Sequence, residues 1–370
     1  MHRGEYFMLF DIEPKTRRED LFSRDNEVDS ILNFIKGRSR FLAIYGIRRV
    51  GKTSVLRVAL NESNIPYCYI DARALENDFT KRRFYQLLSN CLTELSIKWR
   101  LENVIRNIAK IIRGISIFGS GIELNIEVDW RSIYLTDLLN ALSKNLDQIV
   151  IAIDEAQTLR MLKGGFGKID LTQILAYTYD NLSNIKVILT GSEVGLLHDF
   201  LGLENPKSPL YGRFIEELTI TPFNRDASIQ FLITGFRQYG IEITMSEILD
   251  AVDKLDGIVG WLTYYGNARV RGITNIDEIY RRAMELVNEE LRSLLSRSTY
   301  YGLALEAIAR GKKQFGEIRE YITLKLNKYV APSEIERVLN NLMKMNIISR
   351  VSHGEYEIAD PIIRMKFSQI

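Results

Sequence analysis

Cysteine and histidine are scarce in this chain of 370 residues, which has two cysteines and three histidines. Two cysteines do not make the disulfide framework of a small secreted domain, and so few residues of both kinds offer no zinc-ligand spacing. The first residues contain no apolar stretch of the length that a secretory signal peptide needs. We therefore expect a protein of a reducing interior, located in the cytoplasm.

Long apolar runs and a strong net charge are also absent. The stretch that most resembles a lipid-facing segment, residues 104–118, is interrupted by Arg106, Asn107, Lys110 and Arg113. It cannot span a membrane, so it either packs against its own domain, which we favour, or lies on a membrane surface as an amphipathic helix. A net charge of +2 is too small to mark the whole protein as a nucleic-acid binder, so any basic surface must be local.

A glycine-containing segment at residues 46–53 carries the clearest chemical signal. It reads Gly-Ile-Arg-Arg-Val-Gly-Lys-Thr, which fits the phosphate-binding pattern G-x-x-x-x-G-K-[ST]. The apolar residues 41–45 predict a strand before it, and residues 54–60 continue after it with helical spacing. Such a loop aims backbone N–H groups and the positive end of a helix at one point, where a polyphosphate fits. We predict that the nucleotide contacts Gly46, Arg48, Arg49, Val50, Gly51, Lys52, Thr53 and Ser54.

The residue types in this loop suggest separate roles. Its two glycines permit backbone angles and a close approach that a Cβ would block. Lys52 is expected to reach the β- and γ-phosphates, and the Thr53 hydroxyl to ligate Mg²⁺. Arg48 and Arg49 either add positive potential near the phosphates or are ordinary solvated side chains.

A second signal is the apolar run at residues 149–153, which Asp154 and Glu155 follow directly. A run that is apolar on both faces predicts a buried parallel strand, and ligands of open α/β sheets bind at the carboxyl edge of such strands. We expect Asp154 to hold Mg²⁺, directly or through water, and Glu155 to be the general base for an attacking water. The alternative is a pair of solvated carboxylates at a strand end. Gln157 either orients water or is an ordinary polar loop residue.

Two more segments offer polar groups near the same edge. Residues 186–189 predict a third strand, which ends in Thr190, Gly191 and Ser192. Thr190 or Ser192 can contact the γ-phosphate or the water, although turn formation explains them equally simply. Arg213 precedes the last predicted strand; it either stabilises charge on the transferring phosphoryl group, in cis or across a subunit interface, or is a surface arginine.

The order of the predicted elements divides the chain into three parts. Residues 1–222 alternate short apolar runs with helical segments, which indicates an α/β domain with a parallel sheet and an insertion near residues 96–130. Residues 223–298 are predicted to be helical, and residues 299–370 show three helices and a β-hairpin, the order of a winged helix. Strands are expected at residues 41–45, 67–70, 149–153, 186–189 and 217–220, and helix caps at Asn224, Thr244 and either Asn275 or Asp277.

Together these motifs resemble the archaeal ATPase family of the STAND branch (signal-transduction ATPases with numerous domains) of AAA+ P-loop NTPases. The resemblance covers nearly the whole chain and depends on the segments 46–53, 149–157, 189–192, 209–213 and 218–223. It implies a P-loop NTPase sheet followed by an all-α lid that touches the nucleotide.

The resemblance also implies roles for particular residues. Residues 20–27 match a family segment that packs near the adenine, which places Phe22 and Arg24 there. Ser192 is implied as a sensing serine, and Arg213 as an arginine finger. Val259 stands where the family's lid carries a proline, so either Val259 or Arg269 is expected to contact the nucleotide, unless Arg269 is only a surface arginine.

We therefore expect an ATPase switch that binds ATP or ADP with Mg²⁺ and hydrolyses ATP slowly. Its winged helix either binds duplex DNA or, in a signalling or scaffold protein gated by nucleotide, binds protein partners; a homo-oligomer and a small-molecule kinase are further alternatives. Residues 300–370 carry eleven Lys or Arg against eight Asp or Glu, a small basic excess. The candidate DNA contacts are Lys325, Lys328, Arg337, Lys344 and Arg350.

Overall fold

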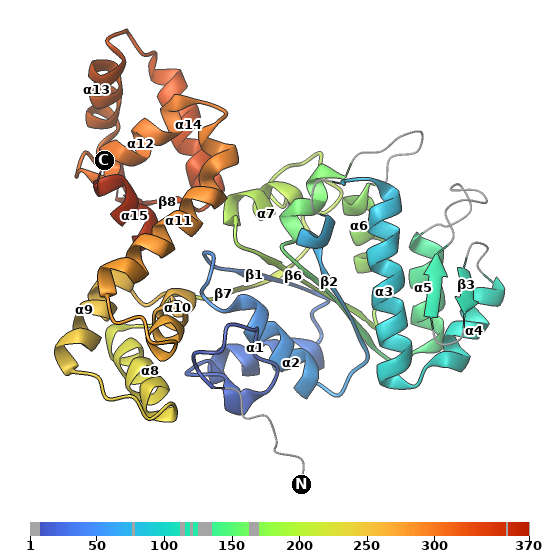
Figure 1. Ribbon diagram of the computed structural model, residues 1–370. Coiled ribbons are helices and arrows are strands. Elements are labelled where there is room, and N and C mark those ends of the chain that lie inside the picture. The colour runs from blue at the N-terminus through green and yellow to red at the C-terminus, as the bar shows by residue number, and fades with distance from the viewer. Residues whose placement is uncertain are drawn as a thin grey trace.

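A five-stranded parallel sheet forms the centre of the computed structural model (Figure 1). The structure describes residues 8–75, 78–111, 115–118, 121–124, 135–162, 170–352 and 354–369. The strand order is β2-β5-β6-β1-β7, and every neighbouring pair is parallel. The strands are β1 (Phe41–Tyr45), β2 (Tyr67–Asp71), β5 (Ile149–Asp154), β6 (Ile185–Gly191) and β7 (Glu216–Thr219). All five strands expected from the sequence are therefore present, within two residues of their predicted bounds.

Helices cover both faces of the sheet, as expected for a P-loop α/β fold. In β1, Leu42 and Ile44 lie in one buried core with α1 and α2, while Phe41 and Ala43 lie in a second core on the other face. This alternation follows from the two-residue period of a strand. The covering helices are α1 (Asp25–Lys36), α2 (Lys52–Glu62), α3 (Lys81–Trp99), α5 (Leu135–Asn145), α6 (Leu171–Asn181) and α7 (Val194–Leu201).

The predicted insertion lies between β2 and β5, at the edge of the sheet beside α3 (Figure 1). It contains α4 (Glu102–Ile111) and an antiparallel pair of strands, β3 (Ile115–Phe118) and β4 (Gly121–Leu124). Ile105 and Ile108 of α4 are buried in the core on one face of the sheet. This supports the expectation that the segment packs against its own domain and not on a membrane surface. No described helix is long and apolar enough to cross a bilayer.

The two cysteines are joined, which the sequence did not lead us to expect. Cys68 in β2 and Cys91 in α3 form a disulfide across a Cα–Cα distance of 5.4 Å. The inference of a reducing interior rested on the scarcity of cysteine, and the structure does not support it.

Four helices follow the sheet at the left of Figure 1: α8 (Arg225–Gln238), α9 (Met245–Leu255), α10 (Val259–Val270) and α11 (Ile276–Leu295). The predicted caps are confirmed, because Asn224, Thr244 and Asn275 accept hydrogen bonds from backbone N–H groups in the first turns of α8, α9 and α11. We call α8–α11 the helical lid.

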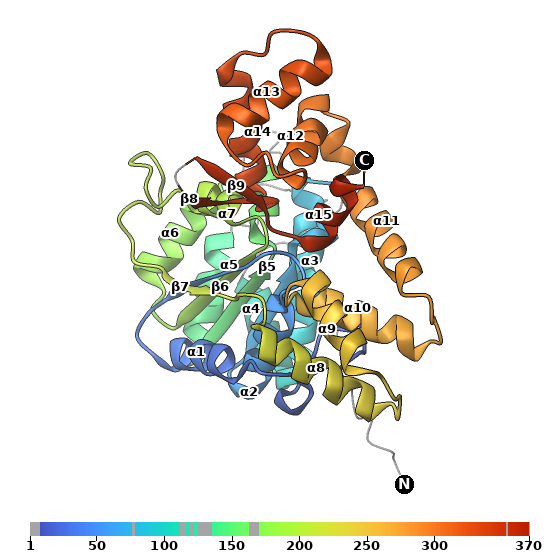
Figure 2. The same ribbon diagram turned by 90° about the vertical axis from the view of Figure 1, so that its left-hand side faces the viewer.

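The C-terminal part has the element order that we expected for a winged helix. It consists of α12 (Thr299–Ala309), α13 (Phe315–Leu326), α14 (Pro332–Lys344), β8 (Ile348–Ser352), β9 (Glu355–Ile358) and α15 (Pro361–Ser368). The last helix, α15, was not predicted. One buried core runs from the lid into this part, and α14 contacts α7 of the sheet domain. Figure 2 shows the C-terminal part at the top of the molecule, above the sheet domain. The C-terminal part is thus docked on both other parts of the molecule.

Candidate functional site

The loop of residues 46–53 connects β1 to α2 at the carboxyl edge of the sheet. Gly46 has φ +154°, and a Cβ there would lie 2.4 Å from the carbonyl oxygen of Ile220. Gly51 has φ +98°, a conformation that favours glycine, and immediately precedes the first residue of α2. Both predicted glycines are therefore needed by the backbone itself.

Lys52 folds back into this loop and is almost completely buried. Its amine donates hydrogen bonds to the carbonyl oxygens of Gly46, at 2.8 Å, and Ile47, at 3.0 Å. Burial lowers the pKa of the Lys52 amine, and the carboxylates of Glu155 and Asp154 act in the opposite direction. The amine is thus held at the loop by weak acceptors that an anion can replace.

Asp154 is fully buried at the end of β5, where hydroxyl groups surround its carboxylate. Oδ2 accepts hydrogen bonds from Thr53 Oγ1 at 2.7 Å and from Tyr69 OH at 2.9 Å, and Oδ1 accepts one from Thr190. Burial, with the charge of Asp154 as the second cause, raises the pKa of Tyr69. The structure therefore brings the two predicted metal ligands, Thr53 and Asp154, into contact. Tyr69 was missed, because nothing in the sequence shows that β2 neighbours β5.

Glu155 adopts a positive φ of 53°, an uncommon backbone conformation that often marks functional sites. Its Oε2 accepts hydrogen bonds from Ser192 Oγ at 2.6 Å, from the Ser192 backbone N–H at 3.1 Å and from Gln157 Nε2 at 2.7 Å. All three donors hold the same oxygen, so they fix the direction of the carboxylate. Ser192 and Gln157 therefore act on Glu155 in this arrangement.

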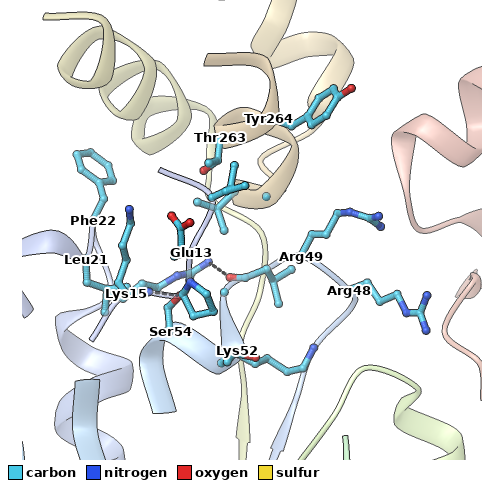
Figure 3. Close-up of a pocket in the computed structure, with 18 of the residues that line it drawn as sticks. Glu13, Lys15, Leu21, Phe22, Arg48, Arg49, Lys52, Ser54, Thr263 and Tyr264 are labelled. Carbon is cyan, nitrogen blue, oxygen red and sulfur yellow. Dashed lines mark hydrogen bonds between the residues drawn. The ribbon is translucent and has the colours of Figure 1, made fainter. Parts of the chain in front are cut away.

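A cavity of about 680 Å³ lies above the loop and is shown in Figure 3. Its walls come from the N-terminal segment of residues 9–24, the loop with Glu155 and Gln157, and residues 259–264 of the lid. Phe22 lines the cavity on the side opposite Arg48 and Arg49 (Figure 3). A cavity of this size, with the phosphate-binding loop on one side and the ring of Phe22 on the other, fits a nucleotide.

Arg24 also lines the cavity, but its guanidinium is occupied by protein groups. It pairs with Glu27 at 2.7 Å and donates hydrogen bonds to the carbonyl oxygens of Val50, at 3.2 Å, and Thr221, at 2.7 Å. It also lies over the ring of Phe223. Arg24 therefore stabilises the phosphate-binding loop through its hydrogen bond to the carbonyl oxygen of Val50.

Arg48 and Arg49 both contact Glu290 of α11. Arg49 additionally lies 4.1 Å from the ring centre of Trp261, and its carbonyl oxygen accepts a 2.8 Å hydrogen bond from the N–H of Gly260. The loop arginines thus join the phosphate-binding loop to the lid, a role that the sequence did not suggest.

Of the two lid candidates, only Val259 lies beside the loop. Val259 lines the cavity next to Gly51. Arg269 instead pairs with Glu247 at 2.7 Å and donates to the carbonyl oxygen of Ile273.

Arg213 lies outside the group of described residues that line the cavity. It pairs with Asp180 at 2.6 Å and also donates to the carbonyl oxygen of Pro209. The arrangement of one chain therefore gives no support to a role in cis, and a role across a subunit interface stays a prediction.

Comparisons with known proteins agree with this geometry. A family model described as an ATPase domain predominantly from Archaea matches residues 21–265. A solved Walker-type ATPase of Pyrococcus abyssi is 35% identical, with a TM-score of 0.81 over 98% of this chain and 100% of that chain. The ORC2 protein of Aeropyrum pernix, solved as ADPNP–ADP complexes, is 15% identical with a TM-score of 0.58 over 98% and 96%, so it shows the fold alone. An uncharacterized protein of Methanocaldococcus jannaschii is 25% identical in an alignment 368 residues long, which covers 96% of this chain and 68% of that protein.

Proposed function

We propose, because the chain belongs to the family of ATPase domains found predominantly in Archaea, that it binds ATP with Mg²⁺ and hydrolyses it slowly. One observation carries the proposal: Lys52, Thr53 and Glu155 line a single cavity of nucleotide size, and Thr53 contacts Asp154, which is buried directly behind it. Binding, metal ligation and water activation each need one of these groups.

The residues fit a magnesium ion. The described residues contain no cluster of three acidic, histidine or cysteine side chains that could hold a metal alone. Mg²⁺ in nucleotide sites takes most of its ligands from phosphates and water and needs only one or two protein oxygens. Thr53 Oγ1 and Asp154 Oδ2, in direct contact at 2.7 Å, would provide them. When bound, the ion would neutralise charge on the β- and γ-phosphates.

The protein groups then divide the work of hydrolysis. The Lys52 amine would leave the carbonyl oxygens of Gly46 and Ile47 and pair with phosphate oxygens. Glu155 would accept the proton of the water that attacks the γ-phosphate, so that ADP and inorganic phosphate are the products. Ser192 and Gln157, which hold one oxygen of Glu155, would orient this base.

The contacts of Arg49 support the switch part of the proposal. The same loop that would grip the phosphates holds α10 through Gly260 and Trp261, and α11 through Glu290. A second cavity of about 220 Å³ continues from Arg48 to residues of the C-terminal part. Changes in the loop on phosphate binding or release would therefore be transmitted to the lid and to the C-terminal part.

DNA binding by the C-terminal part is the finer proposal, and it requires that this part leave its docked position. Lys344, at the end of α14, pairs with Asp199 of α7 at 2.7 Å. Arg337 and Lys344 both line a groove that Gly195 of α7 also lines. Two of the five candidate DNA contacts thus face the sheet domain. The alternative, nucleotide-gated binding of proteins, would use the same release.

Two variants test the ATPase proposal. Glu155→Gln should bind Mg²⁺–ATP as the wild type does and lose turnover by roughly 10²- to 10⁴-fold, the usual contribution of a general base. Lys52→Ala should lose nucleotide affinity in calorimetry. If the Glu155→Gln variant hydrolysed ATP as fast as the wild type, the assignment of Glu155 as general base would be refuted.

Two further assays separate the outputs. Filter binding to duplex DNA, with and without a non-hydrolysable ATP analogue, should show an affinity that falls steeply with salt if the winged helix binds DNA. Size-exclusion chromatography with ADP or the analogue should instead show a nucleotide-dependent mass if the protein gates an assembly.

A further inference from the structure

Arg73 is an arginine at the cavity that no motif in the sequence singles out. It lies in the short helix η2 (Ala72–Leu75), directly after β2. Because β2 pairs in parallel with β5 and places Asp71 opposite Asp154, Arg73 follows the same edge of the sheet as the two carboxylates. It lines the cavity together with Lys52, Glu155 and Gln157.

Arg73 forms an ion pair with its near neighbour Asp71. Asp71 accepts hydrogen bonds from Arg73 Nη2 at 2.6 Å and from Nε at 2.9 Å, and the side chain of Arg73 is 60% exposed. Exposed ion pairs contribute about 0–1 kcal/mol and bidentate ones more, so a phosphate, which accepts from the same two donors and carries a higher charge, can compete with Asp71. The main chain of Arg73 need not move, since η2 continues directly from the paired strand.

Electrostatics place Arg73 within range of the reaction centre. The hydrogen bonds to Asp71 are the main cause that raises the pKa of Arg73, and the charges of Asp154 and Glu155 act in the same direction. In turn, Arg73 is one of the positive groups that lower the pKa of Lys52. A guanidinium this close to the base and to the phosphate-binding lysine can act on charge that develops between them.

Arg73 differs from the other arginines of the cavity's described lining in its position, because it follows β2 at the edge of the sheet where β5 ends in Asp154. Arg24 braces the carbonyl oxygens of Val50 and Thr221, while Arg48 and Arg49 reach Glu290. We therefore propose that Arg73 leaves Asp71 when ATP binds and contacts the γ-phosphate of the same chain's nucleotide, where it stabilises the charge of the transition state. This inference rests on the proposed ATPase function and names the arginine that serves it. A guanidinium matches phosphate geometry through paired N–H donors.

The test compares affinities for nucleotides that differ only in the γ-phosphate. In calorimetry with Mg²⁺, Arg73→Ala should lower the affinity for a non-hydrolysable ATP analogue by about tenfold or more and leave the affinity for ADP unchanged. Turnover should fall further, by about 10³-fold or more, as for arginines that act on the transferring phosphoryl group. Arg73→Lys should keep part of the analogue affinity and little of the turnover, because it retains charge without the planar fork.

Arg225→Ala is the matched control. Arg225 is similarly exposed and pairs with Asp253, but it lies on α8 away from the described lining of the cavity. It should change neither nucleotide affinity nor turnover. Asp71→Asn should raise the preference for the analogue over ADP by a few-fold, and this gain should vanish in the Arg73→Ala background.

Each outcome decides between distinct failures. If the wild-type protein does not hydrolyse ATP, the ATPase proposal falls. If the wild type hydrolyses ATP and Arg73→Ala retains both turnover and the preference for the analogue, only the role of Arg73 is overturned. If turnover and the preference for the analogue were lost in Arg213→Ala but kept in Arg73→Ala, Arg213 would be the arginine that contacts the γ-phosphate.

Discussion

Phe10 fastens the N-terminal segment to the lid, and its packing makes a sharp prediction. Its side chain is completely buried between α8 and α10, with ring centres 4.9 Å from Phe236 and 5.8 Å from Phe231. Two helical glycines, Gly235 and Gly266, face the ring: a Cβ added to them would lie 2.2 and 2.4 Å from ring atoms. The slot for Phe10 therefore exists because both helices lack a side chain there.

The effect of Gly266→Ala should change sign with the size of residue 10. In a helix interior, alanine is more favourable than glycine by about 0.5–1 kcal/mol. Against Phe10 the new methyl group overpacks the slot, which costs about 1–3 kcal/mol, so the substitution should destabilise the wild type. Phe10→Ala alone should lower the free energy of unfolding by about 3–5 kcal/mol. In the Phe10→Ala background, Gly266→Ala should raise that free energy by about 0.5–1 kcal/mol. The coupling energy of the pair is thus about 1–3 kcal/mol.

Hydrogen exchange at the amides of α10 measures this directly, because it reports local opening even where the whole chain does not unfold in two states. Gly316→Ala in α13, where an added Cβ meets no atom within 4 Å, is the control and should stabilise α13 equally in both backgrounds. If Gly266→Ala had the same effect with Phe10 and with alanine at position 10, the proposed packing of Phe10 against Gly266 would be refuted. Phe10→Ala should also weaken ATP binding, because neighbouring residues of its segment line the cavity.

Three further predictions concern charge, crosslink and capping. Bound phosphates should raise the lowered pKa of Lys52, so nucleotide binding should take up a proton at pH values above the pKa of the free protein, and nucleotide affinity should fall as pH rises. Calorimetry in buffers of different ionisation enthalpy detects this proton uptake, and the Lys52→Arg variant should abolish it. Reduction of the Cys68–Cys91 disulfide, which links residues 23 positions apart, should lower the free energy of unfolding by about 3 kcal/mol in denaturant titrations, and the double Ser variant should lose sensitivity to reductant. Asp360→Ala should lower the free energy of unfolding by about 2–4 kcal/mol, because it removes the cap of α15 and leaves the buried indole N–H of Trp261 without its 3.0 Å acceptor. Asp360→Asn should recover part of this stability, and thermal unfolding compares the two variants.

The strands and the phosphate-binding loop could be predicted because their signals are local. Short segments of four or five mostly apolar residues predicted all five strands of the sheet, and the spacing of two glycines and a lysine predicted the loop. Asn224, Thr244 and Asn275 could be recognised as caps because a cap acts on the next three residues.

What the sequence did not reveal depends on which elements become neighbours. Tyr69 and Arg73 reach the site only because β2 lies beside β5, and strand order is not written in any local pattern. The pairing of Cys68 with Cys91 likewise requires α3 to pack on β2. Family resemblance pointed to Arg213 and Arg269, yet both are held by carboxylates outside the cavity in the described structure. Motifs located the pocket, but contacts between distant segments decide which charged residues enter it.

Arg49 shows why this distinction matters for a switch. A loop that only bound phosphate would need no contacts beyond the sheet domain. In this loop, Arg49 contacts Glu290 of α11 and Trp261 of α10, and its carbonyl oxygen accepts a hydrogen bond from the N–H of Gly260. The indole N–H of Trp261, whose ring lies under Arg49, donates to Asp360 at the start of α15, so two successive contacts lead from the loop to the C-terminal part. Coupling between sites is reciprocal in free energy. We therefore expect a partner that pulls the C-terminal part from its docked position to alter nucleotide affinity by as much as nucleotide alters the affinity for that partner.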